Sequence, residues 1–215
     1  MLLLLVPAAF AVPNLQLYSP DAVYNTLTES WETSLDNFEL WVVAANVNTV
    51  VQHNIHLVSV VRPDQDPIDG ALTITPFGGS TKVVNASDYI WGTPPPATEP
   101  DAGSMPGHGW YPSNYFDTKV ANMTDSVNTV NVYDYVNPGA PKKGNIWKFQ
   151  ITTTYSWVGF DAYGYTVGRH DPDVFGKAPF SHNAEAVPPG VPEPATMLLF
   201  GLGAAGMGMI RRFKN

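Results

Sequence analysis

The stretch Ile146–Trp157 (IWKFQITTTYSW) alternates between apolar and polar residues more regularly than any other part of the chain. Successive side chains of a β-strand point to opposite faces, so a period of two residues indicates a half-buried strand. One face would carry Trp147, Phe149, Ile151, Thr153, Tyr155 and Trp157, and the other Ile146, Lys148, Gln150 and Thr152. The pattern predicts a strand over 146–157 that packs its aromatic face on a core.

Further segments of the body have the same character. They are rich in β-branched and aromatic residues, which favour strands, and comprise Phe38–Asn48, His53–Pro63, Val127–Val136 and Val158–Gly168. Proline- and glycine-rich turns separate them at 63–70, 92–103, 137–144 and 168–179. No helical period of 3.6 residues extends through this region. We therefore expect residues 14–183 to form an all-β domain, a β-sandwich with a jelly-roll-like arrangement.

Composition excludes several classes of function. The 215 residues carry a net charge of −8, and no basic stripe could neutralise nucleic-acid phosphates. The chain has no cysteine, which excludes disulfides, thiolate metal sites and cysteine nucleophiles. Charged residues make up 14% of the chain against a usual value of about 25%. Such a composition is common in secreted all-β proteins.

The first residues, MLLLLVPAAFAVPN (1–14), combine a leucine run with a small-x-small pattern at Ala9 and Ala11. This arrangement is typical of a secretory signal peptide cleaved after Ala11, although the basic residues that usually precede the apolar run are missing. We expect residues 1–11 to be a signal peptide, with a truncated start. A buried N-terminal strand is the alternative.

The last residues combine an apolar segment with a cluster of positive charge. Residues 195–210 carry no charge and are followed by Arg211, Arg212 and Lys214. As a helix they would span about 24 Å, close to a hydrocarbon core of about 30 Å. Basic residues after an apolar segment favour the cytoplasmic side. The pattern predicts a transmembrane helix over 195–210 with a basic cytoplasmic tail at 211–215, the alternative being a buried core helix.

Residues Val191, Pro192, Glu193 and Pro194, followed by this apolar run and by Arg211–Arg212, resemble the PEP-CTERM sorting signal of Gram-negative bacteria. The resemblance implies export, a transient stay in the inner membrane, and recognition of the motif by an exosortase that removes the helix. The protein would then reach the cell surface or the polysaccharide matrix. The prolines hold the motif extended, which suits a processing enzyme, and residues 184–194 would be an exposed linker.

The opening NLQLYSPDAVYNTLTESWETSLDNFELWVV (14–43) and the segment WVGFDAYG (157–164) resemble the surface domains named choice-of-anchor, most closely the N type. That resemblance implies a surface-anchored domain without an assigned biochemical role.

The segment Trp91–Tyr115 is too long and too rich in proline and glycine for a hairpin turn. It predicts an Ω-like loop, and long loops are often functional. Trp110, Tyr111 and Tyr115, if displayed on this loop, could stack on sugar rings. Core packing or cross-strand pairing is the alternative for these aromatic residues.

Other candidates for chemistry are sparse. Asp64, Asp66 and Asp69 before Gly70 could bind calcium, or could form a solvated turn. His53 and His56 are spaced poorly for a chelate on a strand. Asp134 and Asp161 are the one pair of strand carboxylates that could serve a glycoside hydrolase.

Three functions follow from these patterns. The first is an exported, exosortase-sorted surface or matrix protein with a structural or interaction role and without catalysis or a required cofactor. The second is a module that binds exopolysaccharide through its aromatic loop. The third, more remote, is a glycoside hydrolase.

Overall fold

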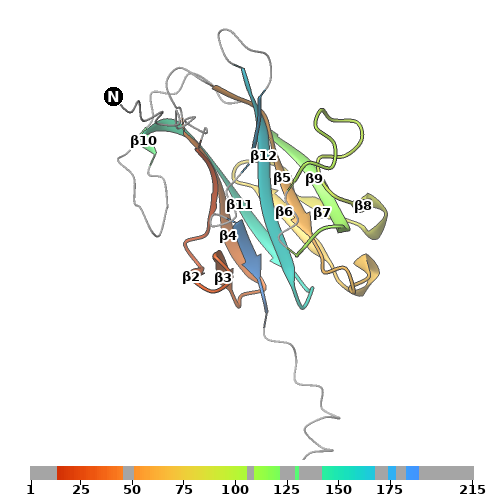
Figure 1. Ribbon diagram of the computed structural model, residues 1–215. Helices are drawn as coiled ribbons and strands as arrows, with labels where there is room; N and C mark the ends of the chain where they lie inside the picture. Colours follow the sequence, from red (N-terminus) through yellow and green to blue (C-terminus); the bar gives the residue numbers. More distant parts are fainter. Residues whose placement is uncertain are drawn as a thin grey trace, which may run out of the picture.

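The computed structural model describes residues 14–45, 51–105, 109–121, 129–130, 142–167, 174–177 and 183–188 (Figure 1). The strands of the first sheet are β1 (Asn14–Tyr18), β4 (Asn37–Ala45), β6 (Leu72–Pro76), β7 (Lys82–Val84), β10 (Thr129–Val130) and β11 (Lys142–Thr153). Those of the second are β2 (Val23–Asn25), β3 (Ser30–Thr33), β5 (Val51–Val60), β8 (Ile90–Gly92), β9 (Ser113–Ala121), β12 (Val158–Val167), β13 (Val174–Lys177) and β14 (Asn183–Ala186). Two 3-10 turns, Pro67–Asp69 and Ala86–Asp88, lie between strands.

The strands form two sheets that pack face to face (Figure 1). The first sheet has the order β1-β4-β11-β6-β7, with β10 also paired to β11. The second has the order β2-β3-β14-β12-β5-β9-β8, with β13 also paired to β12. The apolar core between them includes Leu40, Val42, Ile151, Leu57 and Phe160. The prediction of an all-β sandwich is confirmed, and the chain crosses repeatedly between the sheets, as in jelly-roll-like folds.

The alternating stretch lies at the centre of the first sheet. β11 pairs with β4 on one side and β6 on the other, and Phe149 and Ile151 are buried as predicted. The strand begins and ends four residues earlier than predicted, at Lys142 and Thr153, because the chain turns after Thr153 and enters β12 at Val158. Tyr155 still faces the core and donates a hydrogen bond from its hydroxyl to the carbonyl oxygen of Pro67 at 2.6 Å.

The domain extends further along the chain than the sequence predicts. Residues 184–186, expected to begin an exposed linker, are part of β14, whose four residues are all buried. β14 runs parallel to β3 and antiparallel to β12, and the amide of Val187 donates to the carbonyl oxygen of Thr33 at 2.8 Å. β14 therefore fills a gap in the sheet with a short polar sequence, NAEA, that has no recognisable strand pattern.

A second difference concerns the turn predicted at 168–179, where residues 174–177 form β13 beside β12.

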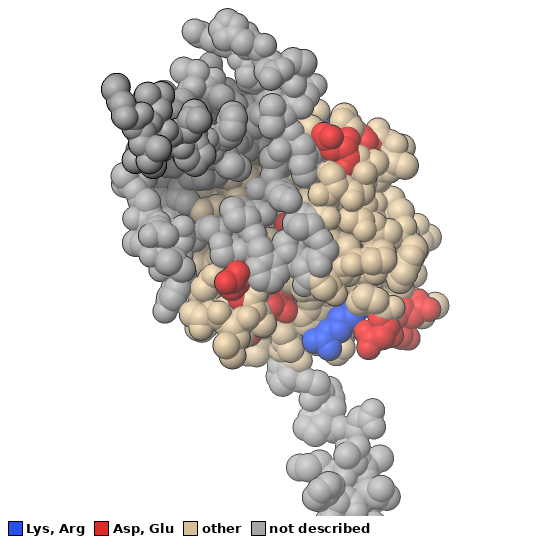
Figure 2. All heavy atoms as spheres, in the orientation of Figure 1, with Lys and Arg blue, Asp and Glu red and all other residues tan. Residues whose placement is uncertain are grey.

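Within the ranges given above, no helix has the length and apolarity that a membrane crossing requires. On the face shown in Figure 2, acidic side chains are scattered over several places whereas basic ones gather at one.

Candidate functional site

The long loop predicted between Trp91 and Tyr115 covers the outer face of the second sheet. β8 and β9 pair with Trp91 opposite Asn114, so the two ends of the loop lie together as in an Ω-loop. The hydroxyl of Tyr165 donates to the carbonyl oxygen of Pro100 at 2.6 Å and ties the loop to β12. Met105 and Tyr111 pack on Val58 and other residues of a second apolar cluster. The loop therefore covers apolar side chains that would otherwise face solvent.

A pocket of about 370 Å³ opens where this loop meets the ends of β5 and β12. Two indole rings form its aromatic part, those of Trp110 and Trp157, which meet edge to face with centroids 5.2 Å apart. Gly159 makes this arrangement possible, because a Cβ atom there would lie 2.7 Å from Trp157 and 2.9 Å from Trp110. Trp110 remains half-buried, so part of its ring is available to a ligand.

Polar groups complete the pocket. The guanidinium of Arg62 lies 5.4 Å from the ring centroid of Trp157, a cation–π contact. The buried carboxylate of Glu185 accepts hydrogen bonds from Trp157 Nε1 at 2.6 Å and from Ser30 Oγ. Thr28 adds a hydroxyl at the edge. The pocket thus offers an aromatic surface, a donor that stays charged and an acceptor within one small volume.

The three predicted glycan-binding residues have different positions. Tyr111 and Tyr115 are 8% and 2% exposed, so neither ring can stack on a sugar. They are buried because they fill the space between the loop and the second sheet. Of the three, only Trp110 lines the pocket. Arg62, Thr28, Trp157 and Glu185 were missed, since they come from segments far apart in sequence and follow no motif.

Burial also determines the ionisation of the tyrosines around the loop. Removal from water raises the pKa of Tyr111 well above its usual value, and the nearby carboxylates of Asp161 and Asp117 raise it further. Burial likewise raises the pKa of Tyr163, as does Asp117. Both phenols stay neutral, and the hydroxyl of Tyr163 donates a hydrogen bond to Oδ2 of Asp117.

No group of three acidic or histidine side chains that could hold a metal ion is found in the described part of the chain, so calcium binding at Asp64, Asp66 and Asp69 stays a prediction beside the alternative of a solvated turn. Asp64, Asp66 and Asp69 lie on one turn but do not converge. Asp66 instead caps the 3-10 turn, with Oδ1 accepting from the amide of Ile68 at 3.0 Å. A cap bonds the carboxylate to a nearby backbone amide. Capped turns therefore contain closely spaced aspartates, as cation-binding loops do.

Two other candidates belong to the second sheet. His56 belongs to no group of metal-ligating side chains within the described ranges; its Nδ1 lies 2.5 Å from Asp117 Oδ1 and its ring stacks on Tyr163. Asp161 is fully buried, and its Oδ1 accepts from the amide of Ala162 at 2.9 Å. A polymeric substrate could not reach such a carboxylate. Asp134, its predicted partner in a hydrolase, and the side chain of His53 lie outside the described residues.

The predicted terminal signals also lie outside the described residues. These are Ala9 and Ala11 at the expected cleavage site, residues 191–194 of the sorting motif, the apolar segment 195–210, and Arg211 and Arg212.

Comparison with known proteins bears on the end of the chain. No curated protein matches it. A solved structure described as "AvmM Catalyzes Macrocyclization in Alchivemycin A Biosynthesis" matches with 10% identity and a TM-score of 0.39, over 84% of this chain and 91% of that one. That similarity is too low to carry an argument, and the likeness to choice-of-anchor domains stays a prediction. Residues 190–212 match the family model of the PEP-CTERM protein-sorting motif, which implies processing by exosortase, export and cell-surface sorting. The chain therefore carries a PEP-CTERM sorting motif, as its last residues predicted.

Proposed function

We propose that this protein is exported, held briefly in the inner membrane by residues 195–210, and released by an exosortase to act at the cell surface or in the extracellular matrix. Its sandwich domain has an interaction role there and no catalytic activity. The sorting motif at 190–212 is the observation that carries this proposal. The basic residues Arg211 and Arg212 support the orientation, since they favour the cytoplasmic side.

The position of β14 sets the distance between the domain and the processing site. Four residues, 187–190, separate Ala186, the last of β14, from Val191 at the start of the motif. The five Cα–Cα steps from Ala186 to Val191 span at most about 17 Å. Cleavage at the motif thus takes place close to the folded domain, and the released protein keeps almost no tail beyond its sandwich.

The pocket of Trp110 and Trp157 favours a second candidate function, the binding of a carbohydrate. Sugar rings have apolar faces and hydroxyl edges, so a site for them combines an aromatic surface with donors and acceptors. Arg62 and Glu185 provide a donor and an acceptor beside the indoles. A protein sorted to the cell surface or the extracellular matrix would encounter exopolysaccharide, which is therefore the expected partner. A mixed aromatic and polar pocket supports binding, whereas a buried Asp161 gives no support to hydrolysis.

A glycan array tests the binding proposal. The full chain would be compared with Trp110→Ala and Arg62→Ala, and with Trp91→Ala as a matched control, because Trp91 is 60% exposed and lies on β8 outside the pocket. We expect Trp110→Ala to weaken binding about tenfold, as the loss of an aromatic contact does, while Trp91→Ala binds normally. Incubation with the bound glycan should release no reducing ends. Absence of binding to every polysaccharide, or equal losses in both tryptophan variants, would remove this function.

A further inference from the structure

The sandwich ends close to the sorting motif, and this limits how an enzyme can reach the motif. Val191 lies at most about 17 Å from Ala186, whereas each helix of a membrane enzyme is about 10–12 Å wide. Two of the four residues between Ala186 and Val191 are prolines, which restrict the backbone further. An exosortase that encloses residues 191–194 therefore meets the surface of the sandwich where β14 ends. This step rests on the proposed processing at the motif.

That surface lies where β2 begins and where β3 and β14 end (Figure 1). The amide of Val187 donates to the carbonyl oxygen of Thr33 at 2.8 Å, which places the first residue after β14 beside the end of β3. Val23 on β2 lies opposite Glu32 on β3. A hollow of about 590 Å³ includes both valines in its lining. We call this region the linker-exit surface, defined by Asp21, Val23, Glu32, Leu35, Asp36 and Val187.

The linker-exit surface exposes apolar side chains. Val23, Leu35 and Val187 are 76%, 47% and 40% exposed. Leu35 and Val187 are neighbours, because the amide of Leu35 donates to Oγ1 of Thr33 at 3.2 Å and Val187 bonds to the same residue. Apolar side chains gathered around a hollow gain free energy when a partner covers them.

The same surface is acidic. The chain contains no lysine or arginine before Arg62, so every fixed charge on β2, β3 and the turns beside them is negative. Asp21 lies next to the start of β4, because its Oδ2 accepts from the amide of Glu39 at 2.8 Å, and Asp36 directly precedes that strand. Carboxylates repel an anionic bilayer and a second copy of the same surface. A protein partner with apolar and basic groups fits this surface instead.

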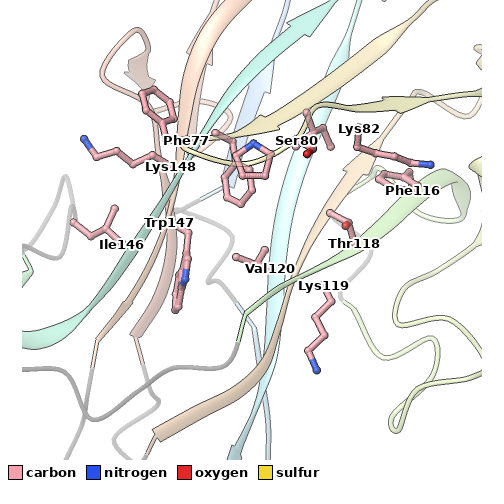
Figure 3. Close-up of a pocket in the computed structure, with 13 residues that line it drawn as sticks. Phe77, Ser80, Lys82, Phe116, Thr118, Lys119, Val120, Ile146, Trp147 and Lys148 are labelled. Carbon is pink, nitrogen blue, oxygen red and sulfur yellow. The ribbon is translucent and has the colours of Figure 1, made fainter.

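Exposed apolar residues elsewhere on the sandwich do not share this position. Phe77 lines a cavity of about 390 Å³ between the two sheets, together with Phe116 and Trp147 (Figure 3). The strands that contribute to this cavity are β6, β7, β9 and β11, and none of them is paired with β14 in the described sheets. This side of the sandwich therefore provides control residues that match those of the linker-exit surface.

We propose that the linker-exit surface is a docking site for the exosortase, which holds the folded sandwich there while its active site encloses the motif. Val23, Leu35 and Val187 contact an apolar patch beside the active site of the enzyme, and the carboxylates face basic residues around that patch. Recognition of the substrate thus extends beyond residues 190–212 to the folded domain.

The first test measures how fast the full chain loses residues 195–215 in an exosortase-containing host after pulse labelling. We expect Val23→Ser to slow processing about tenfold, the effect of losing a valine side chain from an interface. Asp36→Lys should slow it about threefold, because a charge at the rim mainly alters the association rate. Val83→Ser, which changes an exposed valine on β7, and Asp101→Lys, which changes an exposed loop aspartate, are the matched controls and should keep the rate of the parent chain.

The second test identifies what contacts the surface. The chain has no cysteine, so Val23→Cys introduces a single thiol. This thiol is labelled with a maleimide–benzophenone probe in isolated membranes that contain the precursor and a tagged exosortase. We expect light to join the labelled precursor to the tagged enzyme, whereas Val83→Cys gives no such product. Cross-linking reports contact directly, so it stays decisive even where Val23→Ser folds poorly.

The outcomes separate this inference from the proposed function. A parent chain that is never processed contradicts both. A processed parent whose Val23→Ser and Asp36→Lys variants keep its rate contradicts the docking site alone, as does equal slowing by Val83→Ser. Cross-linking of Val23→Cys to lipid shows that a bilayer covers the surface, and cross-linking to a second copy of the chain shows self-association. Either product overturns the inference.

Discussion

Gly159 on β12 offers a direct test of how the candidate carbohydrate pocket is built. Its replacement by alanine adds one methyl group in a space already filled by two indole rings. The new Cβ would lie 2.7 Å from Cη2 of Trp157, 2.9 Å from Cζ3 of Trp110 and 3.0 Å from Cγ1 of Val60. Atoms of this kind do not approach so closely, so at least one indole must move.

The cost follows from overpacking, which typically destabilises a protein by about 1–3 kcal/mol. For a domain of this size, each kcal/mol lowers the melting temperature by about 2–4 °C. We therefore expect Gly159→Ala to lower it by about 3–10 °C. The edge-to-face contact of Trp110 and Trp157 should change too, which near-ultraviolet circular dichroism would detect.

The matched control is Gly79→Ala. Gly79 lies in an exposed turn, where a Cβ would meet nothing nearer than the side chain of Pro76 at 3.1 Å. We expect this change to stay within about 0.5 kcal/mol. If Gly159→Ala unfolds at the same temperature as the parent chain with an unchanged aromatic spectrum, the two indoles are not packed against Gly159 as described. Equal destabilisation by both alanines would also contradict this packing.

Two further predictions concern the ionisable groups. Tyr89, Tyr111, Tyr115, Tyr155 and Tyr163 all have a raised pKa, chiefly through burial. Their phenols ionise near pH 10 when the chain unfolds but stay protonated in the folded domain, so stability should be full below pH 10 and fall above it, by up to about 1.4 kcal/mol per pH unit for each such tyrosine. Thermal unfolding between pH 8 and pH 12 checks this; a flat profile would contradict it. Glu185→Gln should cost about 2 kcal/mol in urea unfolding, because the amide nitrogen cannot accept from Trp157 or Ser30. An unchanged midpoint would show that the carboxylate is not needed there.

The general architecture could be predicted because strands that bury one face have a period-two pattern. Phe149 and Ile151 point inward in β11 as their alternation predicts. β14 escaped prediction because its burial depends on tertiary partners: Glu185 is tolerated inside only where Trp157 and Ser30 donate to it. No local pattern in the sequence NAEA reports those contacts.

The candidate sites were harder to predict for the same reason. Trp110 could be singled out as a loop aromatic, but Tyr111 beside it is buried, and the difference depends on how the loop packs on Val58 and Tyr163. A pocket between the two sheets likewise combines Phe77, Phe116 and Trp147 from three separate strands or turns. The sorting motif is the opposite case, because its residues are consecutive and can be recognised without a fold.

The central claim is that the C-terminal segment is removed at its sorting motif, which leaves the sandwich outside the cell. The most direct test expresses the chain in an exosortase-containing host beside a variant with alanine at Pro192, Glu193 and Pro194, and measures the C-terminus and location of each by mass spectrometry and fractionation. We predict that the parent chain is found outside the inner membrane without residues 195–215, and that the variant stays in the inner membrane with its C-terminus intact. Identical processing and release of the two chains would contradict the claim.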